Sequence, residues 1–208
     1  GAGKSTTIKM LSSILYPTSG TARVMNMVPW ENRQKLSYHI GTVFGQRSQL
    51  WYNLPVQDSF ALFGKMYNLE EVKFKRRLSK LVNMFEIRDL MTHPTRSLSL
   101  GQRMRCEIVA SLIHNPQILF LDEPTTGLHF HDINKLLDAF NALIARGHTI
   151  VIVEHNMDVI KCADWVVDLG PKAGDRGGSI VFEGTPDGLA GCKESYTGRY
   201  LALREKNE

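Results

Sequence analysis

The sequence has 208 residues, of which 43% are hydrophobic and 22% are charged, as in ordinary globular domains, and this composition excludes a disordered tail. No apolar stretch approaches the ~18 residues of a membrane-spanning helix, which excludes a transmembrane channel. The charge is distributed unevenly along the chain. Residues 1–120 carry 16 Lys and Arg against 7 Asp and Glu, whereas residues 121–208 carry 9 Lys and Arg against 14 Asp and Glu. Such an uneven distribution is typical of a basic binding face or of two segments of different ancestry.

Hydrophobic periodicity predicts helices alternating with strands along the chain. Helical spacing of apolar residues predicts helices over residues 8–15, 31–39, 56–85, 100–113 and 133–144, with a charged, solvated face at 70–77. Apolar runs bounded by turn residues predict strands over residues 21–25, 40–44, 118–121, 149–153, 165–169 and 179–182. We interpret residues 118–121 and 149–153 as buried strands. The alternation indicates an α/β fold with a parallel sheet and right-handed crossovers.

The three cysteines, Cys106, Cys162 and Cys192, are widely spaced and form no C-x-x-C pair. The pattern therefore indicates neither a zinc site nor a disulfide framework. We expect reduced, buried thiols, as in proteins of a reducing compartment.

The first six residues, GAGKST, have the form of the end of a phosphate-binding loop, G-x-x-x-x-G-K-[ST], and a helical pattern follows them. In such a loop, backbone N–H groups close on phosphate oxygens at a helix N-terminus. Lys4 would reach the β and γ phosphates, and the Ser5 hydroxyl would ligate Mg²⁺. The first glycine of the loop and its strand would precede Gly1, so we expect a chain truncated at its N-terminus that lacks the first P-loop strand. The predicted nucleotide-binding residues here are Gly1, Gly3, Lys4, Ser5 and Thr6.

Polar side chains follow three predicted strands directly, at the edge where open parallel sheets bind ligands. After the strand at 118–121, Asp122 would hold Mg²⁺ and Glu123 would polarise a water for attack on the γ-phosphate; the alternative is an acid pair that caps the next helix. His155, after the strand at 149–153, would contact the γ-phosphate; the alternative is a structural histidine. Gln46 would reach Mg²⁺ or the attacking water.

The segment Ser99-Leu100-Gly101-Gln102 opens the helix predicted at residue 100 and forms a second anion site. Its hydroxyl, its small glycine and the free N–H groups of a helix N-terminus suit a phosphate. Because one P-loop needs only one such cradle, the second one suggests a nucleotide that is held by another copy of the domain.

In this order the motifs resemble those of the ATP-binding cassette (ABC) ATPases: a Walker A tail at 1–6, the Q-loop glutamine Gln46, a signature LSLGQ at 98–102, Walker B at 118–123 and the switch histidine His155. The family's usual signature is LSGGQ, from which Leu100 departs. The resemblance implies an α/β P-loop NTPase domain spanning residues 1–208, with a parallel core sheet and an inserted helical subdomain at 47–97. It also implies Mg²⁺-dependent ATP hydrolysis in a head-to-tail dimer with a second ABC ATPase domain. Each ATP would lie between the Walker A of one copy and Ser99, Gly101 and Gln102 of the other, with Glu123 as the base.

Residues 1–120 are similar to the ATPase subunits of exporter-type ABC transporters, on the strength of segments 4–20 and 41–54. This similarity implies a membrane permease as partner and a cytoplasmic location at the inner face of the cell membrane. In that family the region after the Q-loop grips the permease. Trp51, Tyr52 and Leu54 would then lie at that contact, although they would serve equally well as core residues.

From residue 125 onward the sequence resembles the C-terminal cassette of the bacterial excinuclease A subunit, in the segments TTGLHF (125–130), EHNMDVI (154–160) and ADWVVDLGP (163–171). His129 stands where transporters usually have Asp. The resemblance implies DNA and excinuclease B as partners. The zinc module and the long insertion that this family carries before its signature are missing here, and the basic residues form no stripe for DNA.

The two resemblances meet at LDEPTTGL, residues 121–128, where the sign of the charge also changes. We interpret this stretch as the junction of a chimera, with a divergent transporter ATPase as the competing hypothesis. The main prediction is the ATP-hydrolysing subunit of an exporter-type ABC transporter. The alternatives are the ATPase module of excinuclease A, or a non-functional chimeric fragment.

Overall fold

A computed structural model describes residues 3–45, 48–170 and 178–205. The chain forms two compact units: a larger one, Met10–Ile152, and a smaller one made of Gly1–Lys9 and Val153–Glu208. Among the helices described, none has the length and apolar character needed to cross a membrane.

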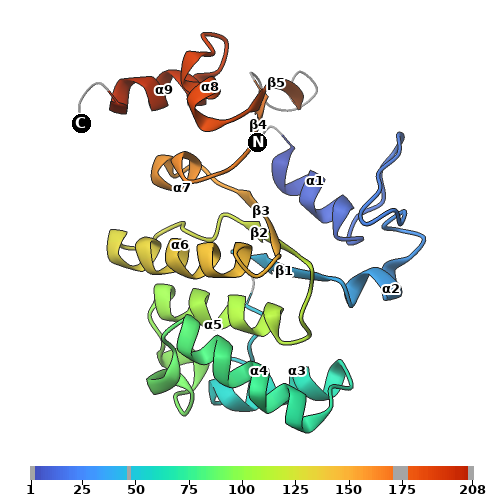
Figure 1. Ribbon diagram of the computed structural model, residues 1–208. Helices are drawn as coiled ribbons and strands as arrows, with labels where there is room; N and C mark the ends of the chain where they lie inside the picture. The colour runs from blue at the N-terminus through green and yellow to red at the C-terminus, as the bar shows by residue number, and fades with distance from the viewer. Residues whose placement is uncertain (1–2, 46–47, 171–177, 206–208) are drawn as a thin grey trace. The chain divides into compact units, whose positions relative to one another are not determined.

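Helices and strands alternate through most of the chain (Figure 1). In chain order they are α1 (Lys4–Leu11), α2 (Arg33–Ser37), β1 (Ile40–Phe44), α3 (Val56–Met66), α4 (Glu71–Met84), the 3-10 turns η1 (Arg88–Leu90) and η2 (Thr95–Ser97), α5 (Leu100–Leu112), β2 (Ile118–Asp122), α6 (Phe130–Ile144), β3 (Thr149–Val153), α7 (Met157–Lys161), β4 (Val166–Gly170), β5 (Ser179–Gly184), α8 (Pro186–Gly191) and α9 (Tyr196–Glu205).

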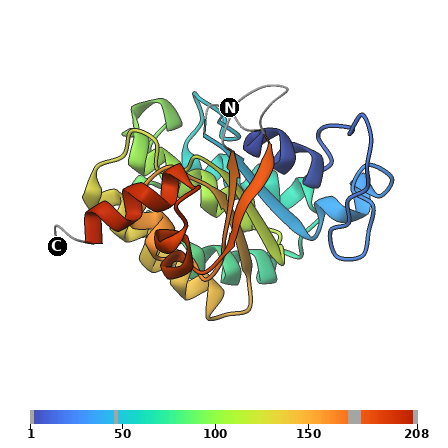
Figure 2. The same cartoon turned by 90° about the horizontal axis from the view of Figure 1, so that it is seen from above.

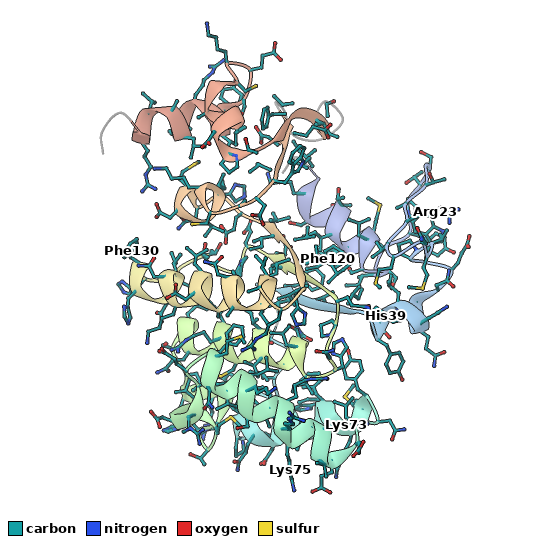
Figure 3. All side chains as sticks on the ribbon, viewed as in Figure 1. Arg23, His39, Lys73, Lys75, Phe120 and Phe130 are labelled. Atoms are coloured by element: carbon teal, nitrogen blue, oxygen red, sulfur yellow. The ribbon has the colours of Figure 1, made fainter. Side chains whose placement is uncertain are left out.

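The sheet that holds the Walker B strand has the order β1-β2-β3, with β2 in the centre. β1 and β2 are parallel, in a register that runs from Ile40 opposite Ile118 to Phe44 opposite Asp122. The central position of β2 explains its burial, and Phe120 is enclosed (Figure 3). The prediction of a second buried strand at 149–153 is wrong: only Val153 is buried, Ile150 and Ile152 are half-buried, and Thr149 and Val151 are exposed. β3 has a described neighbour strand on one side only.

The core of the larger unit is built around α5, which is buried along almost its whole length. α5 packs against β1, α3 and α4 (Figure 1). The sequence predicts its bounds to within one residue. On α6, the expected apolar face is confirmed for Ile133, Leu136 and Phe140, whereas Ile144 is exposed.

Residues 56–85 form two helices where the sequence pattern predicts one continuous helical stretch. Asn68 stops α3 in the left-handed conformation, with φ of 51°. The amide of Leu69 donates to the carbonyl of Gly64 at 2.9 Å, which closes a helix-ending turn. The predicted solvated face lies on the outer side of α4, where Lys73 pairs with Glu70 (Figure 3).

The predicted strand at 21–25 is absent. Residues 21–27 instead make a tight turn with one isolated bridge between Val24 and Met27. Met25 and Asn26 both have positive φ, 51° and 61°, and two such residues in succession reverse the chain. A strand cannot continue through that reversal.

The smaller unit contains a hairpin in which β4 and β5 pair antiparallel (Figure 2). Both strands are predicted from the sequence, but the expected parallel arrangement does not extend to them. Helices α7, α8 and α9 are not predicted, because they are short and their apolar residues do not form a clear helical stripe. A small core of Ile160, Leu189 and Leu201 holds this unit together.

The cysteines are unpaired, and burial differs among them. Cys106 is buried on α5, as expected. The expectation of buried thiols is wrong for Cys162, which is exposed where α7 ends, and Cys192 is half-buried.

Candidate functional site

The predicted P-loop residues of the smaller unit stand at the start of α1. Gly3 has φ of 84°, a conformation that glycine adopts without strain. Its carbonyl accepts hydrogen bonds from Thr7 N at 2.9 Å and Thr7 Oγ1 at 3.0 Å, which open the helix. Lys4 and Ser5 follow in a first turn without acidic residues, so the N-terminal N–H groups of α1 meet no helix carboxylate there. The arrangement suits an anion. Gly1 lies outside the described residues.

Asp122 and Glu123 occupy the carboxyl end of β2 in the larger unit. Glu123 has φ of 53°, in the left-handed region that is uncommon for a residue with a β-carbon. The Gly45 amide, just after β1, donates to the Asp122 carbonyl at 3.1 Å and fixes the turn. The helix-capping alternative for this acid pair is wrong, because the next helix begins only at Phe130.

His155 of the smaller unit follows β3 in a turn that Glu154 organises. The Glu154 carboxylate accepts from the amides of His155 at 2.9 Å and Asn156 at 3.2 Å. The Asn156 side chain in turn caps α7 by accepting from the Asp158 amide at 2.8 Å. The His155 side chain is exposed.

The predicted signature residues stand at the N-terminus of α5, where Ser99 is the N-cap. A capping box joins Ser99 and Gln102: the Gln102 amide donates to Ser99 Oγ at 3.2 Å, and the Ser99 amide donates to Gln102 Oε1 at 2.9 Å. The Ser99 hydroxyl accepts in this pair, so its proton stays available for an anion. The Gln102 amide group likewise keeps its donor hydrogens.

Gly101 is buried under a carboxylate that the sequence does not point to. A β-carbon at Gly101 would lie 2.5 Å from Asp132 Oδ2 and 2.6 Å from Asp132 Cγ. Asp132 is in the first turn of α6, and its contact with Gly101 depends on how α6 packs on α5. No local sequence pattern signals this contact.

The predicted site residues thus divide between the units. Gly3, Lys4, Ser5, Thr6 and His155 belong to the smaller unit, and Ser99, Gly101, Gln102, Asp122 and Glu123 belong to the larger one. Gln46 lies outside the described residues. Within the described part of the chain, no three His, Cys, Asp or Glu side chains gather as a metal-binding group. The predicted magnesium ligands would not form such a group, because they are the Ser5 hydroxyl, the Gln46 amide oxygen and a single carboxylate, that of Asp122.

The family model for the ABC transporter family matches residues 1–126, more than half of the chain. The chain therefore belongs to this family and is an ABC ATPase, a class of enzyme that binds ATP and hydrolyses it to ADP and phosphate. Members of the class work as dimers.

Several curated relatives share one name, UvrABC system protein A. UvrABC system protein A of Clostridium perfringens is 41% identical over 152 residues, 72% of this chain and 16% of that protein. The same protein of Mycobacterium leprae is 48% identical over 112 residues, 52% of this chain and 12% of that protein. That of Paracoccus denitrificans is 58% identical over 85 residues, 41% of this chain and 77% of the sequence compared. The chain spans about one sixth of the length of the Clostridium relative.

Solved structures confirm the predicted ABC-type α/β fold. One structure, described as the ATP binding subunit of an ABC transporter, has a TM-score of 0.79 at 24% identity and covers 98% of this chain and 84% of its own. Another, cbiO1 from Clostridium perfringens, described as part of the ABC transporter complex cbiONQ, has a TM-score of 0.78 at 26% identity and covers 98% and 83%. The predicted resemblance to excinuclease A is likewise confirmed by the curated relatives.

Proposed function

We propose that this chain is an ATP-hydrolysing cassette of the excinuclease A kind, acting on DNA together with an excinuclease B partner in the cytoplasm. The observation that carries the proposal is the 41% identity over 152 residues, because residues 125–208 number only 84 and the similarity must therefore also include residues of the larger unit that precede residue 125. The exporter function expected from residues 1–120 has less support, because the transporter structures are only 24% and 26% identical.

Each predicted residue has a role in this proposal. The start of α1 binds the phosphates through its N–H groups and Lys4, while Ser99 and Gly101 of a second copy complete the sandwich around ATP. Glu123 accepts the proton of the attacking water, and the strained backbone at this residue holds its carboxylate at the strand end. His155 donates to the γ-phosphate. Gln46 orients the water.

Magnesium fits the chemistry of the proposed ligands, the Ser5 hydroxyl, the Gln46 amide oxygen and the Asp122 carboxylate, because Mg²⁺ prefers hard oxygen donors. Asp122 ends the central strand of the sheet and lies opposite Phe44 in the register, so pairing with β1 fixes its backbone position. When bound, Mg²⁺ would neutralise negative charge on the β and γ phosphates.

The test of the catalytic base is Glu123→Gln. General-base catalysis contributes about a hundredfold or more, so phosphate release should fall by at least that factor while ATP binding persists. Glu86→Gln is the matched control: Glu86 has the same left-handed backbone, with φ of 50°, and its exposed carboxylate pairs with Lys135. Undiminished hydrolysis by Glu123→Gln would remove Glu123 as the base.

A second candidate, the motor subunit of an exporter with a membrane permease as partner, is favoured by the helices α3 and α4 within residues 47–97, the proposed helical subdomain. Damaged duplex DNA should raise the rate of ATP hydrolysis if the repair proposal holds. A rate that responds to permease-containing vesicles and not to DNA would favour the exporter.

We also propose that the chain is one ABC domain whose two ancestries join at residues 121–128; the part of the excinuclease A similarity that lies ahead of this stretch would then be similarity that ABC domains share in general. One long, unamplified DNA read across the codons of this stretch tests the junction. A read that never joins the two halves would show an artefact, whereas a continuous frame beside a permease gene would show a transporter ATPase with an unusual tail.

A further inference from the structure

A buried carboxylate, Glu107, lies two turns into α5 and is only 4% exposed. It accepts hydrogen bonds from a single loop: the Gln49 amide donates to Oε2 at 2.9 Å and to Oε1 at 3.2 Å, and Ser48 Oγ donates to Oε1. Burial raises the pKa of the Glu107 carboxyl, and the bonds from Ser48 and Gln49 oppose that rise. The buried carboxylate of Glu107 therefore anchors the loop through these hydrogen bonds.

The same loop is attached a second time, to the segment that leads into α5. The Arg96 amide donates to the Tyr52 carbonyl at 3.0 Å, and the Thr95 amide donates to the Leu54 carbonyl at 3.1 Å. Ser99, the N-cap of α5, follows three residues after Arg96. The loop 48–54 is therefore hydrogen-bonded both to residues 95–96, which precede α5, and to Glu107 within α5.

This loop presents aromatic side chains to solvent. Trp51 is 40% exposed and lies 5.6 Å from the Phe63 ring, and Tyr52 is 62% exposed. Glu107 also lies on the same helix as Ser99, the N-cap of α5. At 1.5 Å per residue, the two residues are about 12 Å apart along the helix. A buried helix of this length moves as a rigid body.

We propose that Glu107 is a positioning residue that makes the loop 48–54 move together with α5, so that nucleotide contact at Ser99 and Gly101 shifts Trp51 and Tyr52. The nucleotide half of this inference rests on the proposed function. Without Glu107, the loop loses its described hydrogen bonds to α5 itself. It keeps its backbone bonds to Thr95 and Arg96, the bond from the Gln49 side chain to the Thr42 carbonyl and the bond from the Trp51 amide to Ser59 Oγ. Motion of α5 then reaches the loop only through the segment that leads into the helix and through side-chain packing. Among the described residues, the side-chain hydrogen bonds of Glu107 go to Ser48 and Gln49 and not to a predicted nucleotide residue, so we assign it a role that acts through the loop.

The first test needs no nucleotide. With Trp30→Phe and Trp165→Phe, Trp51 is the only tryptophan and reports on the loop. Glu107→Ala and Ser48→Ala should each raise acrylamide quenching of Trp51, by about twofold for loss of a local attachment. The double variant should add little to either single change. Ser111→Ala is the matched control, because within the described parts of the chain its buried hydroxyl on α5 bonds only to the Ile108 carbonyl of the same helix.

The second test adds ATP. The wild-type loop should change its Trp51 emission on ATP binding; Glu107→Ala and Ser48→Ala should lose most of that change, with a lower kcat and a KM within about threefold of wild type. Ser111→Ala should keep both. Unchanged quenching and an unchanged ATP response in Glu107→Ala and Ser48→Ala would overturn the proposal. A wild-type chain that neither binds nor hydrolyses ATP would instead refute the proposed function, and quenching alone would then decide the role of Glu107.

Discussion

The histidine His114, which is 9% exposed just beyond the end of α5, makes the stability of the protein depend on pH. Its Nε2 donates to the Ile40 carbonyl at 2.9 Å, and its ring stacks on Tyr67 with centroids 4.0 Å apart. Nδ1 is buried without a hydrogen-bond partner among the described residues. Burial lowers the pKa of His114 from 6.5 to about 4; the bond to Ile40 opposes the change, and the positive charge of Arg77 adds to it.

Acid lowers the stability of the folded chain, because His114 binds a proton more weakly in the folded chain than in the unfolded chain. The unfolded chain takes up a proton below about pH 6.5, whereas the folded chain does so only near pH 4, so stability is full above pH 6.5 and falls as the solution is acidified. With about 1.4 kcal/mol for each tenfold difference in proton affinity, about 2 kcal/mol is lost by pH 5 and about 3 kcal/mol below pH 4.

Urea unfolding at pH 8, 7, 6 and 5 measures this loss. His114→Gln is the comparison, because glutamine keeps an N–H for the Ile40 carbonyl and does not titrate. The free energy of unfolding of the wild-type chain should fall relative to the variant by about 2 kcal/mol between pH 8 and pH 5. A constant difference across that range would refute the reasoning.

Two further predictions concern backbone positions. Gly101→Ala places a methyl group 2.5 Å from Asp132 Oδ2, so we expect it to lower the free energy of unfolding by about 1–2 kcal/mol. Asp132 also pairs with the buried Arg105 at 3.9 Å, so Asp132→Ala has a cost of its own, and the contact is tested by the difference: Gly101→Ala should cost much less in the Asp132→Ala background than in the wild-type chain, and an equal cost in both would contradict the contact. Asn68→Ala should lower the urea midpoint by the equivalent of about 1 kcal/mol because of its left-handed backbone, whereas Asn68→Gly should leave it unchanged or raise it; the reverse order would show that φ at this position is unimportant.

Several elements of this protein could be predicted from the sequence because their signals are local. The strand Ile40–Phe44 is predicted with its observed bounds, and α5 is predicted from Leu100, the residue after its serine cap. The lysine and serine at the start of α1 and the acid pair at the end of β2 are recognisable because phosphate and magnesium demand those residue types at those spacings.

The strand predicted at 21–25 is wrong for a local reason. Met25 and Asn26 are both left-handed, and they break a run that otherwise has the composition of a strand.

Tertiary structure alone decided the features that depend on residues far apart in the chain. Glu107 stands in an apolar stretch of α5, and nothing around it indicates that Ser48 and Gln49, 59 and 58 residues earlier, satisfy its carboxylate. The contact of Asp132 with Gly101 depends on how two helices pack, which local patterns do not encode. A buried polar group has a meaning only through its partners, and folding, not spacing along the chain, brings those partners together.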